Sequence, residues 1–210
     1  MTMRQTQLIF AARVLSMVFT PFYLPLVGMI ALFTFSYMSL APWQFILRIL
    51  AITYIFTVLM PTLLIHLYRR SNGWTLIELG RKEKRMVPYA ISIMCYTACY
   101  TLMEIGHIPH FISLILLIAL AIQITCAVIN VWWKISTHTA AIGGVTGALQ
   151  AYALLIGFNP TWWLCLVITI AGMVGTSRML LRQHTLWQVS AGFLLGTAIA
   201  VAAILISYLC

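Results

Sequence analysis

The sequence predicts an all-α protein, a polytopic bundle of six to seven transmembrane helices, and three observations lead to this prediction. Of the 210 residues, 63% are hydrophobic and 7% are charged, and the mean hydropathy is +1.03. Soluble domains carry about 25% charged residues. Apolar runs of about 20 residues, long enough to cross a bilayer core, follow one another along the chain. The polar residues gather between these runs. We therefore expect residues 1–210 to form a single integral membrane domain, located in a bacterial inner membrane.

The apolar runs place the predicted helices at 13–38, 43–68, 88–102, 111–132, 137–157, 161–178 and 186–208. The first contains Pro21 and Pro25, which we expect to kink it because proline removes a backbone donor. If that region lies at the membrane interface instead, six spans remain. Pro88 stands at the start of the third helix, where proline is favoured. The turn at Asn159-Pro160 reverses the chain between the fifth helix and the sixth.

This arrangement predicts that distant polar clusters meet at one membrane level. The fifth and sixth helices each advance about 30 Å, at 1.5 Å per residue, so they form a hairpin of matched arms. Ser136-Thr137-His138 and Ser177-Arg178 then lie at the same end of that hairpin. The third and fourth helices form another hairpin, which returns the loop 81–88 to that level. Seven glycines on the last three helices allow close packing, and they are Gly143, Gly144, Gly147, Gly172, Gly175, Gly192 and Gly196.

The residue types in these clusters suit a phosphoryl group. Ionisable side chains at membrane depth are costly and indicate function. Arginine binds phosphoryl oxygens, one histidine can attack phosphorus, and a second can protonate the leaving oxygen. Asp is absent and Glu occurs at three positions, which argues against a site built on several carboxylates. The five cysteines form no CxxC pair, so we expect neither a disulfide framework nor a zinc site.

Ser177-Arg178, then five residues, then His184 resembles the third motif of the phosphatidic acid phosphatase type 2 superfamily, S-R-x5-H-x3-D. Ser136-Thr137-His138 resembles its second motif, P-S-G-H. The first motif, K-x6-R-P, has a loose counterpart in residues 81–88. The resemblance covers about residues 78–200. It implies a phosphatase-like core and a metal-independent enzyme without a cofactor. That enzyme hydrolyses a lipid or isoprenyl phosphate or diphosphate through a phosphohistidine intermediate.

The resemblance also implies a role for each matching residue. His184 would be the nucleophile, His138 the acid on the leaving group, and Arg178 the ligand of the phosphoryl oxygens. The other implied phosphate-binding residues are Arg81, Lys82, Arg85, Ser136, Ser177 and Lys134.

Gln188 stands where the family has an aspartate. It could orient the His184 imidazole by a hydrogen bond, but it cannot stabilise imidazolium by charge. Glu83 could supply that charge, or it could be a solvated partner of Lys82 and Lys84.

Other interpretations remain open at this stage. A non-catalytic phospholipid-binding or transport protein with a degenerate phosphatase pocket would also carry these residues. Five histidines permit a haem protein with two histidine ligands, although the cations beside His138 and His184 suit an anion better.

The expected partners are a membrane lipid phosphate and the bilayer. The net charge of +9 gathers at helix ends, which suits lipid headgroups rather than nucleic acid. Lys and Arg placement leaves open which side of the membrane the site faces. His107, His110 and Glu104 are expected together in a separate turn.

Overall fold

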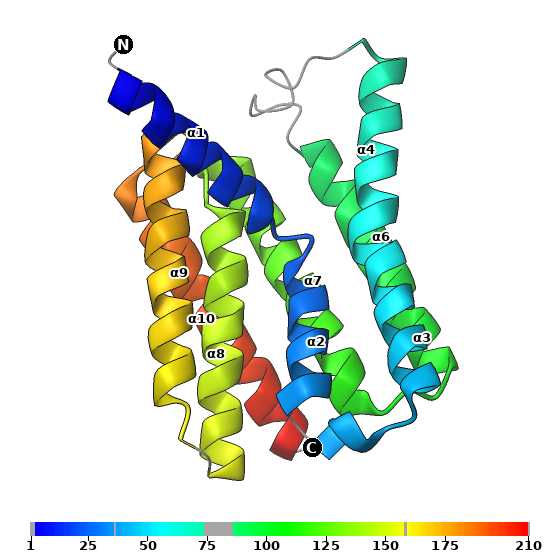
Figure 1. The fold of residues 1–210 in the computed structure, drawn as a ribbon. Helices are drawn as coiled ribbons and strands as arrows, with labels where there is room; N and C mark the ends of the chain where they lie inside the picture. Colours follow the sequence, from blue (N-terminus) through cyan, green and yellow to red (C-terminus); the bar gives the residue numbers. More distant parts are fainter. Residues whose placement is uncertain (1–2, 36, 74–85, 158, 210) are drawn as a thin grey trace. The chain divides into compact units, whose positions relative to one another are not determined.

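The computed structural model describes residues 3–35, 37–73, 86–157 and 159–209, and the regular elements in these ranges are all helical. Figure 1 shows their arrangement. The prediction of an all-α fold is therefore confirmed. The helices are α1 (Met3–Val18), α2 (Leu24–Phe35), η1 (Tyr37–Leu40), α3 (Trp43–Tyr54), η2 (Ile55–Leu59), α4 (Met60–Ser71), α6 (Met86–Ile105), α7 (His110–Trp132), α8 (Thr137–Ile156), α9 (Thr161–Leu180) and α10 (Leu186–Leu209).

Five helical segments in the described ranges are long and apolar enough to cross a membrane, so the chain is a membrane protein. The longest, Trp43–Ser71, joins α3, the π-helical turn η2 and α4 into 29 residues. The others are Met86–Ile105, His110–Trp132, Thr161–Leu180 and Leu186–Leu209. The predicted fifth span is present as helix α8. It is not one of the five segments named above.

The prediction of one helix over residues 13–38 is wrong. Helix α1 ends at Val18 and α2 begins at Leu24, and both are shorter than a membrane span. Pro21 lacks a backbone donor, and the residue before a proline is driven away from helical geometry. The Thr20 hydroxyl accepts a hydrogen bond from the Phe22 N–H at 3.2 Å, which stabilises a turn there. The chain therefore turns at Pro21, where we expected a kinked span.

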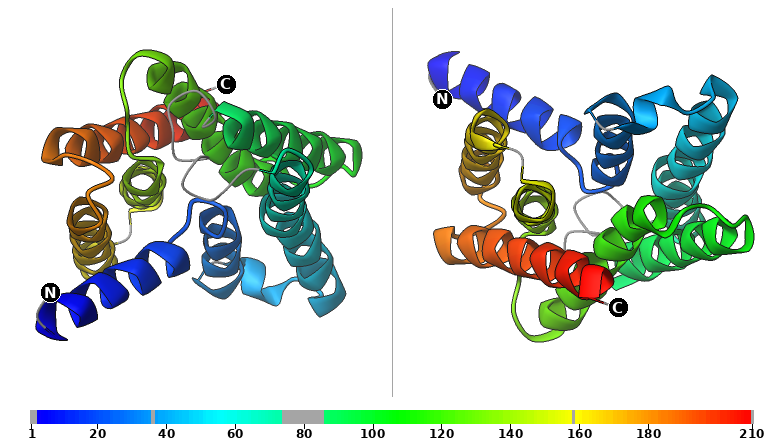
Figure 2. Two further views of the ribbon diagram at one scale, coloured as in Figure 1. Left: turned by 90° about the horizontal axis from the view of Figure 1, so that it is seen from above. Right: turned by 90° about the horizontal axis from the view of Figure 1, so that it is seen from below.

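The helices belong to two compact units. One unit comprises Met1–Leu24 with Val128–Cys210, and the other comprises Pro25–Ala127. In the first unit, α8 packs against α9 and α10, and α1 packs against α9. Figure 2 shows α8 seen nearly end-on, with α1, α9 and α10 around it. The predicted hairpin of the fifth and sixth helices is thus confirmed as α8 and α9.

Helices α8 and α10 meet backbone to backbone in the first unit. A Cβ atom added to Gly196 would overlap the carbonyl of Ala140, and one added to Gly147 would overlap the carbonyl of Thr197. The Thr197 hydroxyl donates to the carbonyl of Gly143 across the same contact, at 3.1 Å. Glycine at these positions lets the two helices approach closely. The close packing predicted for this group of glycines is therefore confirmed for α8 and α10.

Large side chains fill the core of the second unit. Phe33 and Phe45 pack edge to face with ring centroids 6.4 Å apart. Cys99 lies fully buried among apolar neighbours, as expected for a cysteine that acts as a small hydrophobic residue. The fully buried members of this core come from α2, α3, α6 and α7, and they are Met29, Phe33, Ile49, Cys99, Met103, Ile112 and Leu116.

Candidate functional site

Three elements of the first unit meet at the end where the predicted motifs lie. His138 lies in the first turn of α8, Arg178 in the last turn of α9, and His184 in the short segment before α10. The Ser136 N–H donates to the carbonyl of Gln188 at 3.3 Å, which ties the start of α8 to the start of α10. The structure therefore brings together the predicted second and third motifs.

The end of α9 sets the position of His184. Arg182 adopts a left-handed conformation with φ of +52°, of the kind that commonly ends a helix. The chain then turns back. The N–H groups of Gln183 and His184 both donate to the carbonyl of Arg178, at 3.1 and 3.4 Å. This backbone turn holds His184 beside Arg178.

His138 belongs to the same cluster. It lies close enough to Arg178 and His184 for their charges to act on it, and it forms a hydrogen bond with the backbone of Ser16. Its Nδ1 atom is buried and has no hydrogen-bond partner among the described residues. A buried polar atom without a partner carries a free-energy cost of about 1–3 kcal/mol, so such atoms often mark a place where a ligand binds. A guanidinium and two imidazoles are groups that can donate hydrogen bonds to the oxygens of an anion, so the cluster has the chemistry of an anion site.

Sequence reasoning missed one member of this cluster. Arg178 donates from Nη1 to the Oγ atom of Ser16 at 2.6 Å, and Ser16 lies on α1, 162 residues away along the chain. Ser16 is buried. A single hydroxyl in an apolar run is a weak signal, because most such hydroxyls bond to their own helix.

The two serines predicted to bind phosphate have local partners. Ser136 is completely buried, and its Oγ caps α8 by accepting a hydrogen bond from the Thr139 N–H at 3.5 Å. Ser177 is 2% exposed, and its hydroxyl donates to the carbonyl of Val174 at 2.7 Å. Both hydroxyls thus contribute to local helix structure. Their role in phosphate binding stays a prediction.

Gln188 also has a structural partner. Its Oε1 accepts a hydrogen bond from the N–H of Thr185, the residue before α10, at 3.1 Å. A glutamine three residues after a threonine at a helix start is the capping-box pattern, in which the side chain reaches back to the helix end. The sequence Thr185-Leu186-Trp187-Gln188 carries this signal. The orientation of His184 by Gln188 stays a prediction.

The remaining predicted site residues divide into two groups. Lys134 is half-buried in the segment between α7 and α8, next to the start of the motif. Arg81, Lys82 and Arg85 lie outside the described residues, as does Glu83, so the first motif stays a prediction. Within the described ranges, no three side chains of His, Cys, Asp or Glu are grouped so that they could hold a metal ion.

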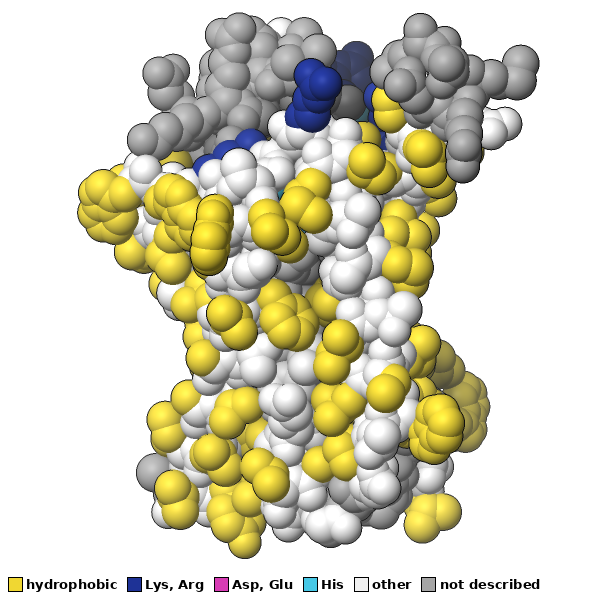
Figure 3. Space-filling view, turned by 90° about the vertical axis from the view of Figure 1, so that its left-hand side faces the viewer, with side chains coloured by type: hydrophobic (Ala, Val, Ile, Leu, Met, Phe, Trp, Pro, Cys, Tyr) yellow, Lys and Arg dark blue, Asp and Glu magenta, His cyan; other side chains and the backbone are white. Residues whose placement is uncertain are grey.

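The surface around the site is typical of a membrane interface. On the face drawn in Figure 3, Lys and Arg side chains gather at the upper end and hydrophobic side chains cover the length below. In the first unit, Trp132 and Trp187 are 75% and 79% exposed near the site, and Trp162, at the other end of the α8–α9 hairpin, is 86% exposed. Tryptophan is enriched at both interfaces of a membrane. These positions are typical of tryptophans at the two interfaces of a membrane.

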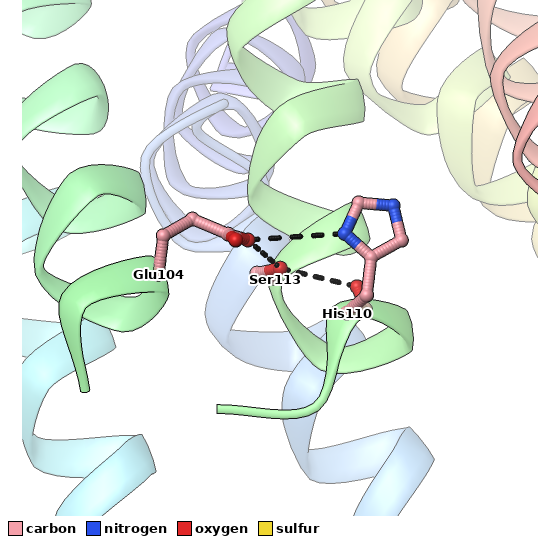
Figure 4. A network of polar contacts seen from close by, with 3 residues as sticks. All are labelled: Glu104, His110 and Ser113. Carbon is pink, nitrogen blue, oxygen red and sulfur yellow. Dashed lines mark hydrogen bonds and ion pairs between the residues drawn. The ribbon is translucent and has the colours of Figure 1, made fainter. Parts of the chain in front are cut away.

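A separate polar network lies in the second unit, where α6 turns into α7. Ser113 donates to Glu104 at 2.7 Å, and His110 Nδ1 lies 3.8 Å from the same carboxylate oxygen (Figure 4). Ser113 also contacts the carbonyl of His110 at 3.1 Å. The prediction that Glu104 neighbours a histidine of this turn is confirmed. This network closes a hairpin and uses no residue of the cluster around Arg178.

Comparisons of the chain with protein-family models, with curated proteins and with solved structures found no match. The residues of the cluster are therefore the basis on which a function can be inferred.

Proposed function

We propose that this chain is a metal-independent membrane phosphatase that hydrolyses a lipid or isoprenyl phosphate or diphosphate. The observation that carries the proposal is the grouping of Arg178, His138 and His184 at one end of the first unit. A guanidinium and two imidazoles can together bind phosphoryl oxygens, attack phosphorus and protonate a leaving group. The apolar surface of the neighbouring helices suits a substrate whose hydrocarbon tail lies in the bilayer.

The proposed reaction has two steps. A ring nitrogen of His184 attacks phosphorus, the bond from phosphorus to the leaving oxygen breaks, and His138 gives that oxygen a proton. Water then attacks the phosphohistidine, the P–N bond breaks, and His138 takes the proton that the water loses. Arg178 binds the non-bridging oxygens, where negative charge must be stabilised during both transfers.

The test is phosphate release from a panel of phosphorylated lipids, with no metal added, by purified protein in detergent or vesicles. We expect His184→Ala and Arg178→Ala to reduce release to background. His110→Ala is the matched control, because it removes a histidine from the other polar network and should leave release unchanged. Release by His184→Ala at the parent rate would contradict the proposal, as would the absence of release from every lipid tested.

A second candidate function is non-catalytic phospholipid binding or transport through a degenerate pocket. The observation that favours it is that Ser136, Ser177 and Gln188 each use a side-chain atom in a local helix contact. Under this alternative, the parent would bind phosphorylated lipid vesicles and release no phosphate. Lipid-dependent release that is lost in His184→Ala would exclude it.

A further inference from the structure

The contact between Ser16 and Arg178 lies outside the roles assigned above. The distance of 2.6 Å from Nη1 to Oγ is at the short end of the range for hydrogen bonds. Bonds from an ionised donor are shorter and stronger than neutral ones. Both side chains are at least partly buried, so water competes weakly for them. This bond therefore holds the guanidinium in one place.

The Ser16 hydroxyl departs from the usual behaviour of hydroxyls within helices. A helical serine or threonine commonly bonds to the carbonyl four residues earlier, as Thr57 and Thr62 do in this chain. Ser16 Oγ instead contacts Arg178 on α9, and no bond to its own helix is found among the described residues. A hydroxyl has one donor and two acceptor positions. While it accepts from Arg178, it can still donate to an oxygen that the same guanidinium binds.

The location of Ser16 on α1 adds to this effect. Ser16 lies in the last turn of α1, which ends at Val18. The end of a helix carries partial negative charge from its last carbonyls, which favours a nearby cation. His138 also forms a hydrogen bond with the backbone of Ser16. One residue of α1 therefore contacts two of the three groups in the cluster.

We propose that Ser16 is a positioning residue that fixes the guanidinium of Arg178 for binding of a phosphoryl group. The inference rests on the proposed function for its substrate class. It makes α1 a part of the phosphate site rather than a helix that only covers it. A guanidinium held before the substrate arrives needs less reorganisation when charge develops on the phosphoryl oxygens.

The test compares four variants by steady-state phosphate release. Ser16→Ala removes the hydroxyl, and we expect kcat/KM to fall roughly tenfold, the effect of losing a hydrogen bond to a charged group. Ser16→Thr keeps the hydroxyl and should recover most of the activity. Ser16→Val has the shape of threonine without the hydroxyl and should behave like alanine. Ala12→Gly is the control for α1 itself, because it weakens the same helix one turn earlier and should leave kcat/KM near the parent value.

Three results would overturn the inference. The first is an unchanged kcat/KM in Ser16→Ala. The second is a KM of Ser16→Ala below that of the parent, which would mean that the hydroxyl competes with phosphate for Arg178. The third is an equal loss in Ala12→Gly, which would mean that docking of α1 alone is responsible. If Ser16→Ala does not fold, as judged by thermal unfolding, the comparison of Ser16→Thr with Ser16→Val decides in its place.

Binding of orthovanadate, followed by tryptophan fluorescence, separates this inference from the proposed function. A parent that binds vanadate more tightly than Ser16→Val, yet releases no phosphate from lipids, would support the role of Ser16 and contradict the phosphatase. If the parent and Ser16→Val hydrolyse lipid phosphate at equal rates, the result supports the proposed phosphatase and overturns the role of Ser16. A parent that neither binds vanadate nor hydrolyses lipid would overturn both.

Discussion

The two units of the chain achieve close packing in opposite ways. In the first unit, α8 and α10 lie so close that glycine Cα atoms face carbonyl groups of the neighbouring helix. In the second unit, large side chains such as those of Ile49 and Leu116 fill the space between helices. Between helices in lipid, close approach of backbones is itself a source of stability, because the lipid tails are as apolar as the side chains.

The close contact between backbones occurs in the unit that contains the candidate site. A contact between two backbones has no side-chain rotamers to adjust, so it fixes the relative position of two helices closely. His138 lies in the first turn of α8, and the segment that contains His184 leads into α10, so we expect the glycine contact to constrain how the two histidines are placed. The described part of the second unit contributes no residue to the cluster, and its core is filled by side chains that can adapt. The comparison predicts that added side-chain atoms destabilise the first unit most, and that removed side-chain atoms destabilise the second unit most.

The largest expected effect is on stability in the first unit. Gly196→Ala adds a methyl group that meets the backbone carbonyl of Ala140, which cannot turn aside as a side chain could. We expect it to lower the free energy of unfolding by about 3 kcal/mol, the upper part of the usual range for overpacking. Thermal unfolding in detergent would measure this loss.

Gly172→Ala is the matched control, because a Cβ at that position of α9 meets nothing within 4 Å in the described part of the chain. Alanine is a better helix former than glycine by about 1 kcal/mol, so this variant should be as stable as the parent or more so. Equal effects of the two substitutions would show that the close contact between α8 and α10 does not exist.

The next effect couples packing to the proposed activity. A Cβ at Gly192 would lie 2.6 Å from the Ser136 carbonyl and 2.7 Å from the Thr139 hydroxyl, so Gly192→Ala pushes on the first turn of α8. His138 lies in that turn. A displacement of about 1 Å can cost on the order of a hundredfold in rate, and we expect kcat/KM for lipid phosphate to fall by up to that factor. A rate equal to that of Gly172→Ala would argue that His138 does not act in the reaction.

The hairpin of α8 and α9 could be predicted from the sequence because its parts are local. Two apolar runs of matched length, separated by Asn159-Pro160, leave few other paths for the chain. The structure adds a left-handed Gly157 at the end of α8 and a bond from the Thr161 N–H to the Asn159 side chain at 3.0 Å. The meeting of His138 with Arg178 follows from this hairpin, and so it was also predictable.

The contact with α1 was not predictable in the same way. The sequence suggests a kink at Pro21, but it does not indicate that the helix stops at Val18 and brings Ser16 to Arg178, because that depends on packing between distant segments. The Gln188 cap is a different case, since the T-x-x-Q pattern in the sequence by itself indicates the contact with the Thr185 N–H. Tertiary packing decides which of several possible partners a polar side chain contacts, and residue spacing alone does not determine it.

A smaller effect is expected in the second unit from removal of one methylene group. Ile49 is completely buried in the core formed by α2, α3, α6 and α7. Ile49→Val should cost about 1 kcal/mol through lost van der Waals contacts, with no change in phosphate release. Thermal unfolding and the lipid assay on the same preparation would measure both quantities. A loss of activity at unchanged stability would contradict the expectation that Ile49 contributes to packing alone.

The smallest effect is expected at the α6–α7 turn. His110 and Glu104 are about half exposed, with side-chain exposures of 55% and 43%, and their closest atoms are 3.8 Å apart. Exposed ion pairs contribute about 0–1 kcal/mol, and this one is at the long end of the distance range, so His110→Ala should change the unfolding free energy by less than about 0.5 kcal/mol. Ser113→Ala should cost somewhat more, because it removes the 2.7 Å bond to Glu104. Thermal unfolding of the two variants side by side would test the order. A larger loss for His110→Ala than for Ser113→Ala would mean that the histidine, rather than the serine, holds the carboxylate and the hairpin together.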